Sequence, residues 1–425
     1  MAELALTRHR HPDGTPRSLA EYTRTGGYLQ ARRAWQQLTP AELVQLVSRS
    51  GLRGRGGAGF PTGKKWSFMP PPDGSPGHRY LICNFDEMEP GTYKDRFLVE
   101  GDPHLLIEGM LIAAAACQCD TGYIFLRGEY GVVRERLTRA LAEAEQAGWI
   151  GAHAGGSDRP FRLHLHLSAG RYICGEETGL LNALEGRRAN PRAKPPFPVQ
   201  VGAWGRPSVV NNVETLGNLP AILREGPDWY RGLGRGADAG TKLYAASGRV
   251  RRPHCAELPL GITLRELVFE EMGGMQEGRR FVAALPGGGS TRFLGEDGLD
   301  LPLDFGSLQA AGLSLGTGTA IVVDDGVCPV DLLRNLAQFY ARESCGWCTP
   351  CREGLPWVEG LLRGIEEGTA RPGDLELLEE QLGLIGPNTF CAFALGAVQP
   401  LASGLQLFHQ DFAEHLRLGR CPRRR

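Results

Sequence analysis

The chain has 425 residues, 42% of them apolar, and its 47 Lys and Arg nearly balance its 48 Asp and Glu. These proportions are ordinary for a globular protein of two or three domains, and they exclude a nucleic-acid binder that relies on a basic surface. The sequence has no run of about 18 apolar residues to cross a membrane and no basic start leading into an apolar signal core. We therefore expect a cytoplasmic protein without a direct membrane span, and we interpret the basic tail from 417 to 425 as a solvated end.

Helices and strands alternate over the first 240 residues. Thr39, Pro40 and Glu42 form a capping box that opens a helix, which Gly51 ends. Further on, the apolar patterns predict strands at Tyr80–Asn84, Tyr123–Arg127 and Phe161–Leu167, and helices at His104–Cys117, Val132–Ala147 and Thr178–Glu185. Such alternation is typical of an α/β fold whose sheet contains parallel strands.

The pattern changes after this region. Pro-rich segments at 191–198 and at Pro207 predict ordered loops, and Asn211–Thr215 leads into a helix. A small α+β unit follows, with strands at Lys242–Val250, Phe281–Leu285 and Ala320–Val323, a helix at Thr263–Met272 and a turn at Gly287–Gly289. After Pro329 the chain becomes helical, at Val330–Arg342, Leu355–Glu367 and Leu375–Leu384. The sequence thus predicts three domains, with boundaries at 1–240, 241–328 and 329–425.

One group among the 11 cysteines has the spacing of a metal site. Cys345, Cys348 and Cys351 form C-x-x-C-x-x-C, and Cys391 lies 40 positions beyond the third. Four thiolates divided three plus one are typical ligands of a [4Fe–4S] cluster, whereas structural zinc usually takes two separated pairs. We expect the cluster and keep zinc as the alternative. The remaining cysteines are expected to be buried small side chains without a role: Cys83, Cys117, Cys119, Cys174, Cys255, Cys328 and Cys421.

A glycine-rich loop from Gly54 to Phe60 contains G-x-G-x-x-G. The dinucleotide-binding fingerprint requires a strand before this motif, but a helix precedes it here, so an ordinary Rossmann interpretation fails. Glycines still let backbone amides approach a phosphate or a ring, and Lys64 and Lys65 could neutralise a phosphate. A tight turn between two helices is the alternative explanation.

Two acidic turns each follow a predicted strand. Asp86, Glu87 and Glu89 lie at the end of the strand that begins at Tyr80, and Glu176 and Glu177 precede a helix. Ligands of open α/β sheets bind at such strand ends, although either turn alone could be a solvated loop. Several carboxylates would repel a 2′-phosphate, so we expect NADH rather than NADPH, and we expect Glu177 to contribute to that choice.

Seven segments together resemble one family. They are GLRGRGGAGF (51–60), NFDEMEPGTYKDR (84–96), RYICGEET (171–178), EGRRANPRAKPPFP (185–198), NNVET (211–215), ESCGWCTPCREG (343–354) and NTFCA (388–392). The sequence resembles the NADH-binding flavoprotein subunits of bacterial respiratory complex I, an NADH:quinone oxidoreductase. The resemblance extends from about residue 27 to about residue 412, with no departure at the positions named next.

The resemblance implies FMN, NAD(H) and one [4Fe–4S] cluster as cofactors. The residues that it implies for FMN are Gly54, Arg55, Gly56, Lys65, Asn84, Asp86, Gly175, Glu176, Asn211, Asn212 and Thr215. The adenine of NADH would stack on Phe60, Phe68 and Phe197, and Glu87, Glu89 and Glu177 would line the nicotinamide and ribose, with Glu87 and Glu177 as the catalytic contacts. Gly57, Ala58, Gly59 and Tyr172 would complete the cofactor site, and Cys345, Cys348, Cys351 and Cys391 would bind the cluster.

The resemblance also implies a fold, a reaction and partners. The fold would combine a Rossmann-like FMN domain, a ubiquitin-like β-grasp (SLBB) domain and a C-terminal helical bundle. NADH would pass a hydride to FMN, and single electrons would continue to the cluster, because a flavin links two-electron and one-electron chemistry. A [2Fe–2S] thioredoxin-like subunit and a large iron–sulfur subunit would be the partners, in a peripheral arm at the inner face of the plasma membrane.

Three other functions are compatible with parts of the sequence. The nearest is the diaphorase flavoprotein subunit of an NAD-reducing hydrogenase or an NAD-dependent formate dehydrogenase. Such chains often carry a fused [2Fe–2S] segment, whereas here the first cysteine is Cys83 and the glycine loop begins at position 54. A non-catalytic assembly protein and a zinc-binding interaction module are the other two, and both would lack FMN.

Overall fold

The computed structural model describes residues 4–72, 74 and 77–423, so the first three residues and the last two of the basic tail lie outside it. The protein has two compact units. The first comprises Met1–Met88, Tyr93–Tyr244 and Cys255–Ile262, and the second comprises Glu89–Thr92, Ala245–His254 and Thr263–Arg425. The division into three domains remains a prediction.

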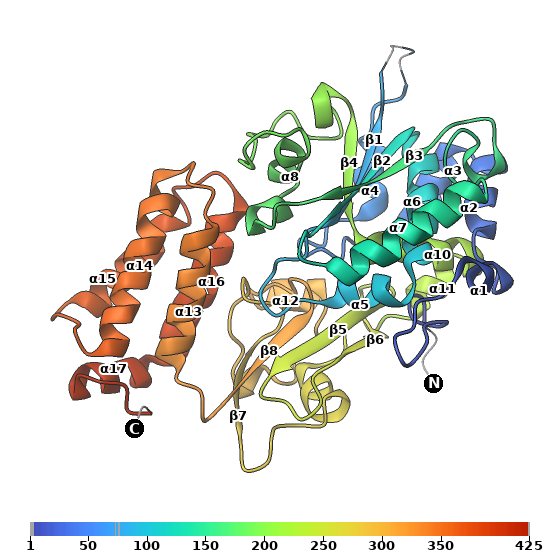
Figure 1. Ribbon diagram of the computed structural model, residues 1–425. Coiled ribbons are helices and arrows are strands. Elements are labelled where there is room, and N and C mark those ends of the chain that lie inside the picture. Colours follow the sequence, from blue (N-terminus) through green and yellow to red (C-terminus); the bar gives the residue numbers. More distant parts are fainter. Residues whose placement is uncertain (1–3, 73, 75–76, 424–425) are drawn as a thin grey trace. The chain divides into compact units, whose positions relative to one another are not determined.

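A parallel sheet forms the centre of the first unit. Its strands are β1 (Tyr80–Phe85), β2 (Thr121–Leu126), β3 (Arg162–Leu167) and β4 (Ser208–Asn212). They lie in the order β3-β2-β1-β4, and every neighbouring pair is parallel (Figure 1). This arrangement confirms the predicted α/β fold. The strand β4 was not predicted, because the segment after Pro207 was interpreted as a loop.

The strand order reverses beside β1. The protein backbone moves from β1 to β2 and β3 in one direction, and β4 then returns to the other side of β1. Cys83 pairs with Asn211 and Asn84 with Asn212, so the carboxyl ends of β1 and β4 lie together. In open α/β sheets a crevice for ligands forms at such a reversal, because the two connections leave in opposite directions.

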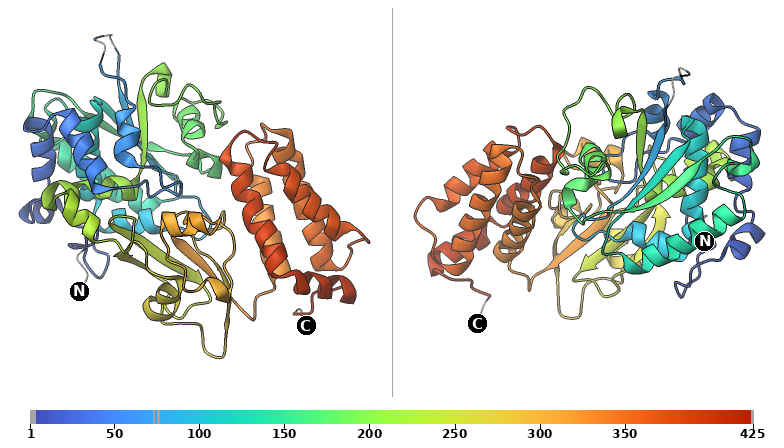
Figure 2. Two further views of the ribbon diagram at one scale, coloured as in Figure 1. Left: turned by 180° about the vertical axis from the view of Figure 1, so that it is seen from behind. Right: turned by 45° about the horizontal axis from the view of Figure 1, so that its top comes forward.

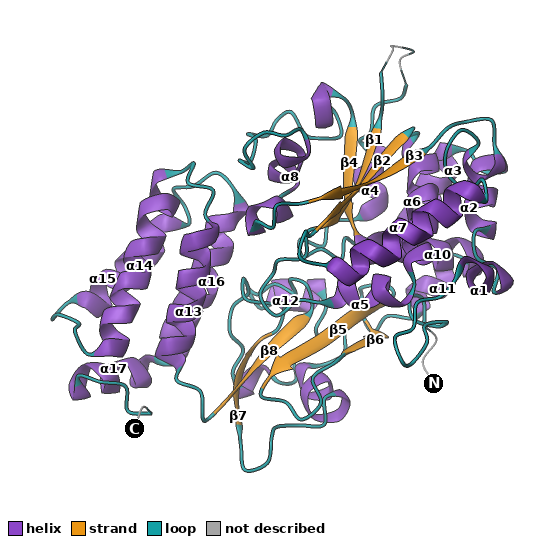
Figure 3. Ribbon diagram, in the orientation of Figure 1, coloured by secondary structure: helices purple, strands orange, loops and turns teal. Residues whose placement is uncertain are grey.

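Eleven helices of at least five residues accompany this sheet in the described part of the first unit (Figure 3). They are α1 (Leu19–Arg24), α2 (Leu29–Gln36), α3 (Pro40–Ser50), α4 (Thr62–Ser67), α5 (Lys94–Gly101), α6 (Pro103–Cys117), α7 (Gly131–Gln146), α8 (Glu177–Leu184), α9 (Val213–Gly217), α10 (Leu219–Glu225) and α11 (Pro227–Gly232). The helices α3, α6, α7 and α8 confirm the predicted ones within a few residues.

The helix α6 lies in the core of the first unit. All fifteen of its residues are buried, and its N-cap, Asp102, accepts a hydrogen bond of 3.2 Å from the amide of Leu105. The helix packs against β1 and α9. At Gly109 the approach to α9 is so close that a Cβ atom would lie 2.2 Å from the carbonyl oxygen of Leu216. Only glycine fits there, because any side chain would push the two helices apart.

The predicted capping box begins α3. The amide of Thr39 donates to the carboxylate of Glu42 at 2.7 Å, and the amide of Glu42 donates to the Thr39 hydroxyl at 3.3 Å. Gly51 ends the helix with φ +70°, a conformation that glycine adopts without strain. The glycine-rich loop therefore lies between α3 and α4, which confirms that no strand precedes it.

The second unit contains a mixed sheet. Its order is β6-β5-β8-β7, with strands β5 (Thr241–Gly248), β6 (Cys255–Pro259), β7 (Phe281–Leu285) and β8 (Thr319–Asp324). The first residues of β5 and all of β6 belong to the first unit. The pair β5–β8 is parallel, whereas β7–β8 is antiparallel. The predicted helix at Thr263–Met272 contains a π-helix at Glu266–Glu271, and α12 covers Phe305–Ala310.

The rest of the second unit is helical. Four long helices pack side by side, and a fifth, shorter helix contacts three of them (Figure 2). They are α13 (Pro329–Glu343), α14 (Thr349–Glu367), α15 (Asp374–Ile385), α16 (Ala392–Leu407) and α17 (His409–Leu418). The first three confirm predicted helices. No helix among the described residues is both long and apolar enough to span a membrane.

Candidate cofactor and cluster sites

Polar side chains converge where the first sheet reverses its strand order. The Asn84 amide donates to the carbonyl oxygen of Gly175 at 3.1 Å, and the Asn84 side-chain oxygen accepts from the amide of Asp86 at 3.1 Å. On the neighbouring strand, Asn211 accepts a hydrogen bond of 3.0 Å from the Trp66 indole. These contacts orient the ends of β1 and β4 toward the glycine-rich loop and the second acidic turn.

Asp86 has one carboxylate oxygen in use and one without a partner. The Ser168 hydroxyl donates to Oδ2 at 2.6 Å. Oδ1 is buried and has no hydrogen-bond partner among the described residues. Burial raises the pKa of Asp86 to about 6, because the charged form loses hydration. A buried acceptor without a donor is costly, so the arrangement fits a bound group that brings its own hydroxyl or N–H.

The glycine-rich loop is closed on itself and rests on the beginning of α9. The amide of Gly54 donates to the carbonyl of Phe60 at 2.9 Å, which closes the loop, and the amide of Arg55 donates to the Thr215 hydroxyl at 2.8 Å. A Cβ atom at Gly56 would lie 3.1 Å from the Cβ of Asn212. Around Gly57, by contrast, a Cβ would meet no described atom within 4 Å. The loop therefore presents backbone beside the strand ends, with open space above Gly57, as a flat or anionic ligand requires.

The side chain of Arg55 is completely buried and lies inside the first unit. Its guanidinium donates to the Tyr230 hydroxyl at 3.1 Å and to the carbonyl oxygens of Ala239 and Thr241 at 2.9 and 3.1 Å. These contacts hold the loop to the end of α11 and the start of β5. Arg55 thus offers its backbone rather than its charge to the loop surface.

The second acidic turn is held by two lysines. Glu177 accepts hydrogen bonds from Lys65 at 2.7 Å and from Lys194 at 2.8 Å, and Lys65 also donates to the carbonyl of Val210 at 2.9 Å. Burial opposes the charged form of Glu177, but the two ammonium groups outweigh it and lower the pKa of the carboxylate below its ordinary value. Glu176 caps α8 by accepting from the amides of Thr178 and Gly179, both at 2.9 Å. The turn from Tyr172 to Gly175 leads directly into this cap.

The two remaining acidic residues of the first turn are engaged elsewhere. Glu87 is buried at the N-terminus of α5, where it accepts from the amides of Asp95 at 2.8 Å and Arg96 at 3.1 Å. Burial, followed by the charge of Asp95, raises the pKa of Glu87 to about 7. Glu89 belongs to the second unit, where it accepts from the amide of Ser290 at 2.6 Å.

The three phenylalanines of the predicted adenine site are all exposed. Their exposed fractions are 45% for Phe60, 51% for Phe68 and 51% for Phe197. The rings of Phe60 and Phe68 lie 6.4 Å apart between centroids. Aromatic side chains that are half exposed can stack on a planar ligand without any rearrangement of the core.

A buried network of ion pairs that contacts Asn212 was not predicted. Lys94 contacts Asp95 at 2.7 Å and Glu214 at 2.9 Å, and Lys242 contacts Glu214 at 3.1 Å. Asp95 also accepts from the Asn212 amide at 2.6 Å, so the network fixes the end of β4. Burial lowers the pKa of Lys242 to about 8. Lys94 and Asp95 occur within the motif at 84–96, which is the signal that could have identified them.

Ser168 is a second residue that the sequence did not reveal. It directly follows β3, so it lies at the carboxyl ends of the strands, like Asn84 and Asn212. The rule that parallel strands present ligand-binding residues at their carboxyl ends could have identified it.

The three cysteines of the C-x-x-C-x-x-C segment and the distant Cys391 all lie in the second unit. Cys345 follows α13, Cys348 precedes α14, Cys351 lies in its first turn and Cys391 precedes α16. Cys351 is buried, and its Sγ lies 3.1 Å from the Ser344 hydroxyl. Burial raises the pKa of Cys351 to about 11, and the charges of Cys391, Cys345 and Cys348 act in the same direction. The other three thiols thus lie near enough to Cys351 to act on it electrostatically, and the four remain the predicted cluster ligands.

Two family models match the chain. The model described as "Nuo51 FMN-binding domain" matches residues 47–221, and the one described as "NADH-ubiquinone oxidoreductase-F iron-sulfur binding region" matches residues 331–415. The first range contains the glycine loop, both acidic turns and the ends of β1 and β4. The second contains all four predicted cluster cysteines.

Curated relatives and a solved structure match over nearly the whole chain. The chain is 55% identical over 408 residues to an NADH-quinone oxidoreductase subunit of Escherichia coli (strain K12), covering 96% of this chain and 92% of the relative. It is 49% identical to the corresponding subunit of Rhizobium meliloti (strain 1021), covering 97% of each. The crystal structure of an air-oxidised NAD+-reducing [NiFe]-hydrogenase is similar at a TM-score of 0.81 and 35% identity, covering 98% of this chain and 68% of that one. The family models and relatives agree, and the chain belongs to the family of NADH-quinone oxidoreductase subunits that contain an FMN-binding domain and an iron–sulfur region.

Proposed function

We propose that the chain oxidises NADH at a flavin site built where the sheet of the first unit reverses its strand order. The observation that carries this proposal is the buried, partnerless oxygen of Asp86 at the ends of β1 and β4, beside the glycine-rich loop. As a member of its family, the chain is the NADH dehydrogenase flavoprotein subunit of an NADH:quinone oxidoreductase. FMN, when bound, accepts the hydride of NADH and supplies single electrons to the [4Fe–4S] cluster.

The residues of the chain position and neutralise the cofactor in this proposal. The amides of the loop from Gly54 to Gly59 approach the flavin and its phosphate, because no Cβ blocks the open side at Gly57. Asn84, Asp86 and Asn212 offer hydrogen bonds at the strand ends. Lys65 lies between the loop and Glu177 and supplies positive charge there. The other FMN contacts are Arg55 through its backbone, Gly175, Glu176, Asn211, Thr215 and Tyr172.

The NADH would lie across the same surface. Phe60, Phe68 and Phe197 are exposed and can stack on its adenine. Glu177, held between two lysines, would line the nicotinamide and ribose side of the bound NADH. Glu87 would act through the N-terminus of α5 and the backbone at the end of β1, since its carboxylate is occupied there. Glu89 is proposed as a further contact to NADH.

We also propose the domain type of the second sheet, the helices that carry the cluster, and the partner subunits. The sheet of the second unit would be a β-grasp (SLBB) domain, and α13–α17 would form the helical bundle that carries the cluster on Cys345, Cys348, Cys351 and Cys391. Trp347 and Phe390 are exposed next to two of these cysteines, which fits an apolar surface covered by a partner. The partners would be a [2Fe–2S] thioredoxin-like subunit and a large iron–sulfur subunit, in an arm at the inner face of the plasma membrane.

The flavin site can be tested with two aspartates, one at the carboxyl ends of the strands and one at their amino ends. Asp86→Ala removes the acceptor at the carboxyl ends of the strands, and we expect at least about tenfold weaker FMN binding, equal to about 1.4 kcal/mol. Asp120→Ala is the control, since Asp120 precedes β2 at the amino ends. The measurement is FMN bound per chain, with bleaching of the flavin band when NADH is added without oxygen. Equal FMN binding in both variants would contradict the proposed site.

The diaphorase subunit of an NAD-reducing hydrogenase remains the second candidate, because one such enzyme has a similar fold. The identity of 55% to a quinone oxidoreductase subunit, against 35% to the hydrogenase, favours the respiratory enzyme. Identification of the subunits that copurify with the chain distinguishes the two.

A further inference from the structure

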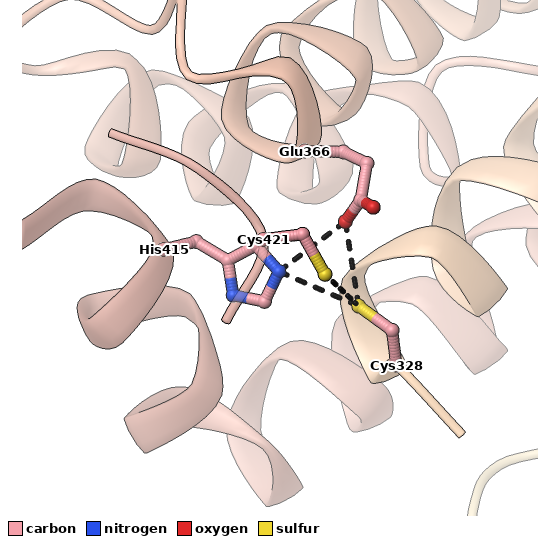
Figure 4. A group of neighbouring side chains, drawn as sticks. All are labelled: Cys328, Glu366, His415 and Cys421. Atoms are coloured by element: carbon pink, nitrogen blue, oxygen red, sulfur yellow. Dashed lines mark hydrogen bonds and ion pairs between the residues drawn. The ribbon is translucent and has the colours of Figure 1, made fainter. Parts of the chain in front are cut away.

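A second group of metal-binding side chains lies in the helical part of the second unit. Cys328, Glu366, His415 and Cys421 point toward one another, and one ligand atom from each lies within 4.8 Å of the others (Figure 4). Cys328 is the N-cap of α13, Glu366 lies near the end of α14, His415 lies in α17, and Cys421 follows α17. From the sequence, neither cysteine was expected to have a role. Because they are separated by 93 positions, their spacing carries no recognisable motif.

Four of the six separations between the ligand atoms are known individually, and they are close to the edges of a tetrahedron. The two Sγ atoms are 3.6 Å apart, and Cys328 Sγ lies 3.3 Å from Glu366 Oε2 and 3.4 Å from His415 Nε2. Nε2 and Oε2 are 3.2 Å apart. Tetrahedral zinc, with Zn–S near 2.3 Å and Zn–N and Zn–O near 2.0 Å, places its ligand atoms roughly 3.3–3.8 Å from one another. A disulfide would require the sulfur atoms to be about 2.05 Å apart, which these are not.

We propose that Cys328, Glu366, His415 and Cys421 bind a structural zinc ion, separate from the iron–sulfur cluster. Two thiolates, one imidazole and one carboxylate are a ligand set that suits zinc. Four protein ligands leave no open position for water or substrate, so the ion stabilises the fold and has no catalytic role.

The hydrogen bonds around the group prepare it for a cation. His415 Nδ1 lies 2.6 Å from the carbonyl oxygen of Asp411, so Nδ1 carries the hydrogen and donates it there. When the ring is neutral, the lone pair of Nε2 faces Oε2 of Glu366 and Sγ of Cys328, and a bound cation would stabilise this arrangement. His415, Glu366 and Cys421 are 0%, 2% and 3% exposed, so bulk water cannot solvate these side chains. The amide of Asp331 donates to Cys328 Sγ at 3.5 Å.

The site lies at the other ends of two helices from the cluster ligands. Cys328 begins α13, whereas Cys345 follows its end, and fifteen helical residues extend about 22 Å. Glu366 is close to the end of α14, whereas Cys351 lies in its first turn. The proposed zinc would thus tie α17 and the segment after it to the ends of α13 and α14.

The experiment is a metal count on the full chain, purified without chelator and without a histidine tag. We expect about one zinc per chain beside the iron of the cluster. Cys328→Ser, His415→Gln and Cys421→Ser should each lower the zinc content at least tenfold and leave iron and FMN unchanged. Cys119→Ser is the matched control, because this buried cysteine lies in the first unit, where its thiol donates to the Cys117 carbonyl. Zinc retained in the three variants, or absent from the unmodified chain, overturns the proposal.

A second measurement on the unmodified chain keeps the test valid if the variants fail to fold. X-ray absorption at the zinc edge should give two sulfur ligands near 2.3 Å and two nitrogen or oxygen ligands near 2.0 Å. Four sulfur ligands would place the zinc on the cluster cysteines instead, and would overturn the assignment. A disulfide between Cys328 and Cys421, detected by peptide mapping without reduction, would also overturn it.

Discussion

Glu177 lies between two positive charges, and its removal should change which nucleotide is oxidised. In the wild-type chain the carboxylate neutralises Lys65 and Lys194 and adds negative charge near the proposed ribose site. In Glu177→Gln, Lys65 loses its carboxylate partner and Lys194 keeps only Glu176, so more positive charge is available to a 2′-phosphate. We expect kcat/KM for NADPH relative to NADH to rise about tenfold, which corresponds to about 1.4 kcal/mol.

The control for this prediction is Glu135→Gln, which removes an exposed carboxylate of α7 in the same unit. Steady-state kinetics with both nucleotides, using an artificial electron acceptor, measures the ratio. An unchanged ratio in Glu177→Gln would show that this carboxylate has no part in nucleotide selection.

Asp86 should make the stability of the flavin-free chain depend on pH. Its pKa is about 6 when folded and 3.8 in the unfolded reference, so the folded state binds the proton more tightly. The stabilisation is complete below the lower value and is lost as the pH rises through about 6. Between about pH 4.5 and 7, the free energy of unfolding of the wild type should fall by about 2 kcal/mol relative to Asp86→Asn.

Urea unfolding of the flavin-free wild type and Asp86→Asn at several pH values measures this difference. The amide does not titrate in this range, and its oxygen can still accept from Ser168. A difference that stays constant with pH would mean that the buried carboxylate ionises normally.

Two glycines within helices test the packing that positions the flavin site. Gly109→Ala in α6 places a Cβ 2.2 Å from the carbonyl oxygen of Leu216 in α9, the helix that carries Thr215. We expect a loss of about 1–3 kcal/mol in unfolding free energy and weaker FMN binding, because α9 must move.

Gly131→Ala at the start of α7 is the matched control, since its Cβ would meet no described atom within 4 Å. It should be neutral or stabilising by up to about 1 kcal/mol, since alanine has the higher helix propensity. Denaturation midpoints and FMN titrations of both variants test this. Equal stabilities would contradict the close approach of α6 and α9.

The elements that the sequence predicted correctly are those with a long pattern or a cap. The helix α3 has a capping box and a terminal glycine, and α6 has an uninterrupted apolar run. Most of the missed elements are short or have polar residues inside, and the longest of them, α16, is interrupted by Pro400. The strand β4 has five residues after a proline, and α5 begins with Lys94 and Asp95, which are buried only because they pair with each other and with Glu214. Such pairing depends on residues distant in sequence, so local patterns do not show it.

The same distinction applies to the sites. Cys345, Cys348 and Cys351 could be predicted as ligands because they are adjacent in sequence, and the strand-end rule pointed to Asp86. The inward direction of the Arg55 side chain could not be predicted, because it depends on carbonyl oxygens of residues 239 and 241. The convergence of Cys328 with Cys421 likewise requires the packing of α13 against α17.

The division into two units predicts that the flavin and cluster chemistries can be separated. The FMN residues belong to the first unit, and all four cluster cysteines belong to the second. In Cys348→Ser we expect loss of the cluster, while FMN content and flavin reduction by NADH stay within about twofold of the wild type. Electron transfer to quinone in the whole complex should be abolished.

Visible absorption during an anaerobic NADH titration and low-temperature EPR measure the two properties in one sample. Cys174→Ser is unsuitable as a control, because its thiol lies close to Asp86. Cys119→Ser is the control, because Cys119 is neither a proposed FMN residue nor a cluster cysteine. This variant should keep the flavin absorption band and the EPR signal of the cluster. Loss of FMN in Cys348→Ser would show that the first unit depends on the cluster for its fold.

The position of β4 at the far side of β1 has a consequence for biosynthesis. The strand that completes the sheet, and the two asparagines that end it, are translated after β1, β2 and β3. Pairing across so long a loop is slow, because the chain must first lose the entropy of closure. Until then β1 has an unpaired edge, which can associate with other nascent chains. Insertion of the flavin at the proposed site therefore has to follow synthesis of residue 212, since a chain that ends before that point has three strands of the sheet and lacks Asn211 and Asn212.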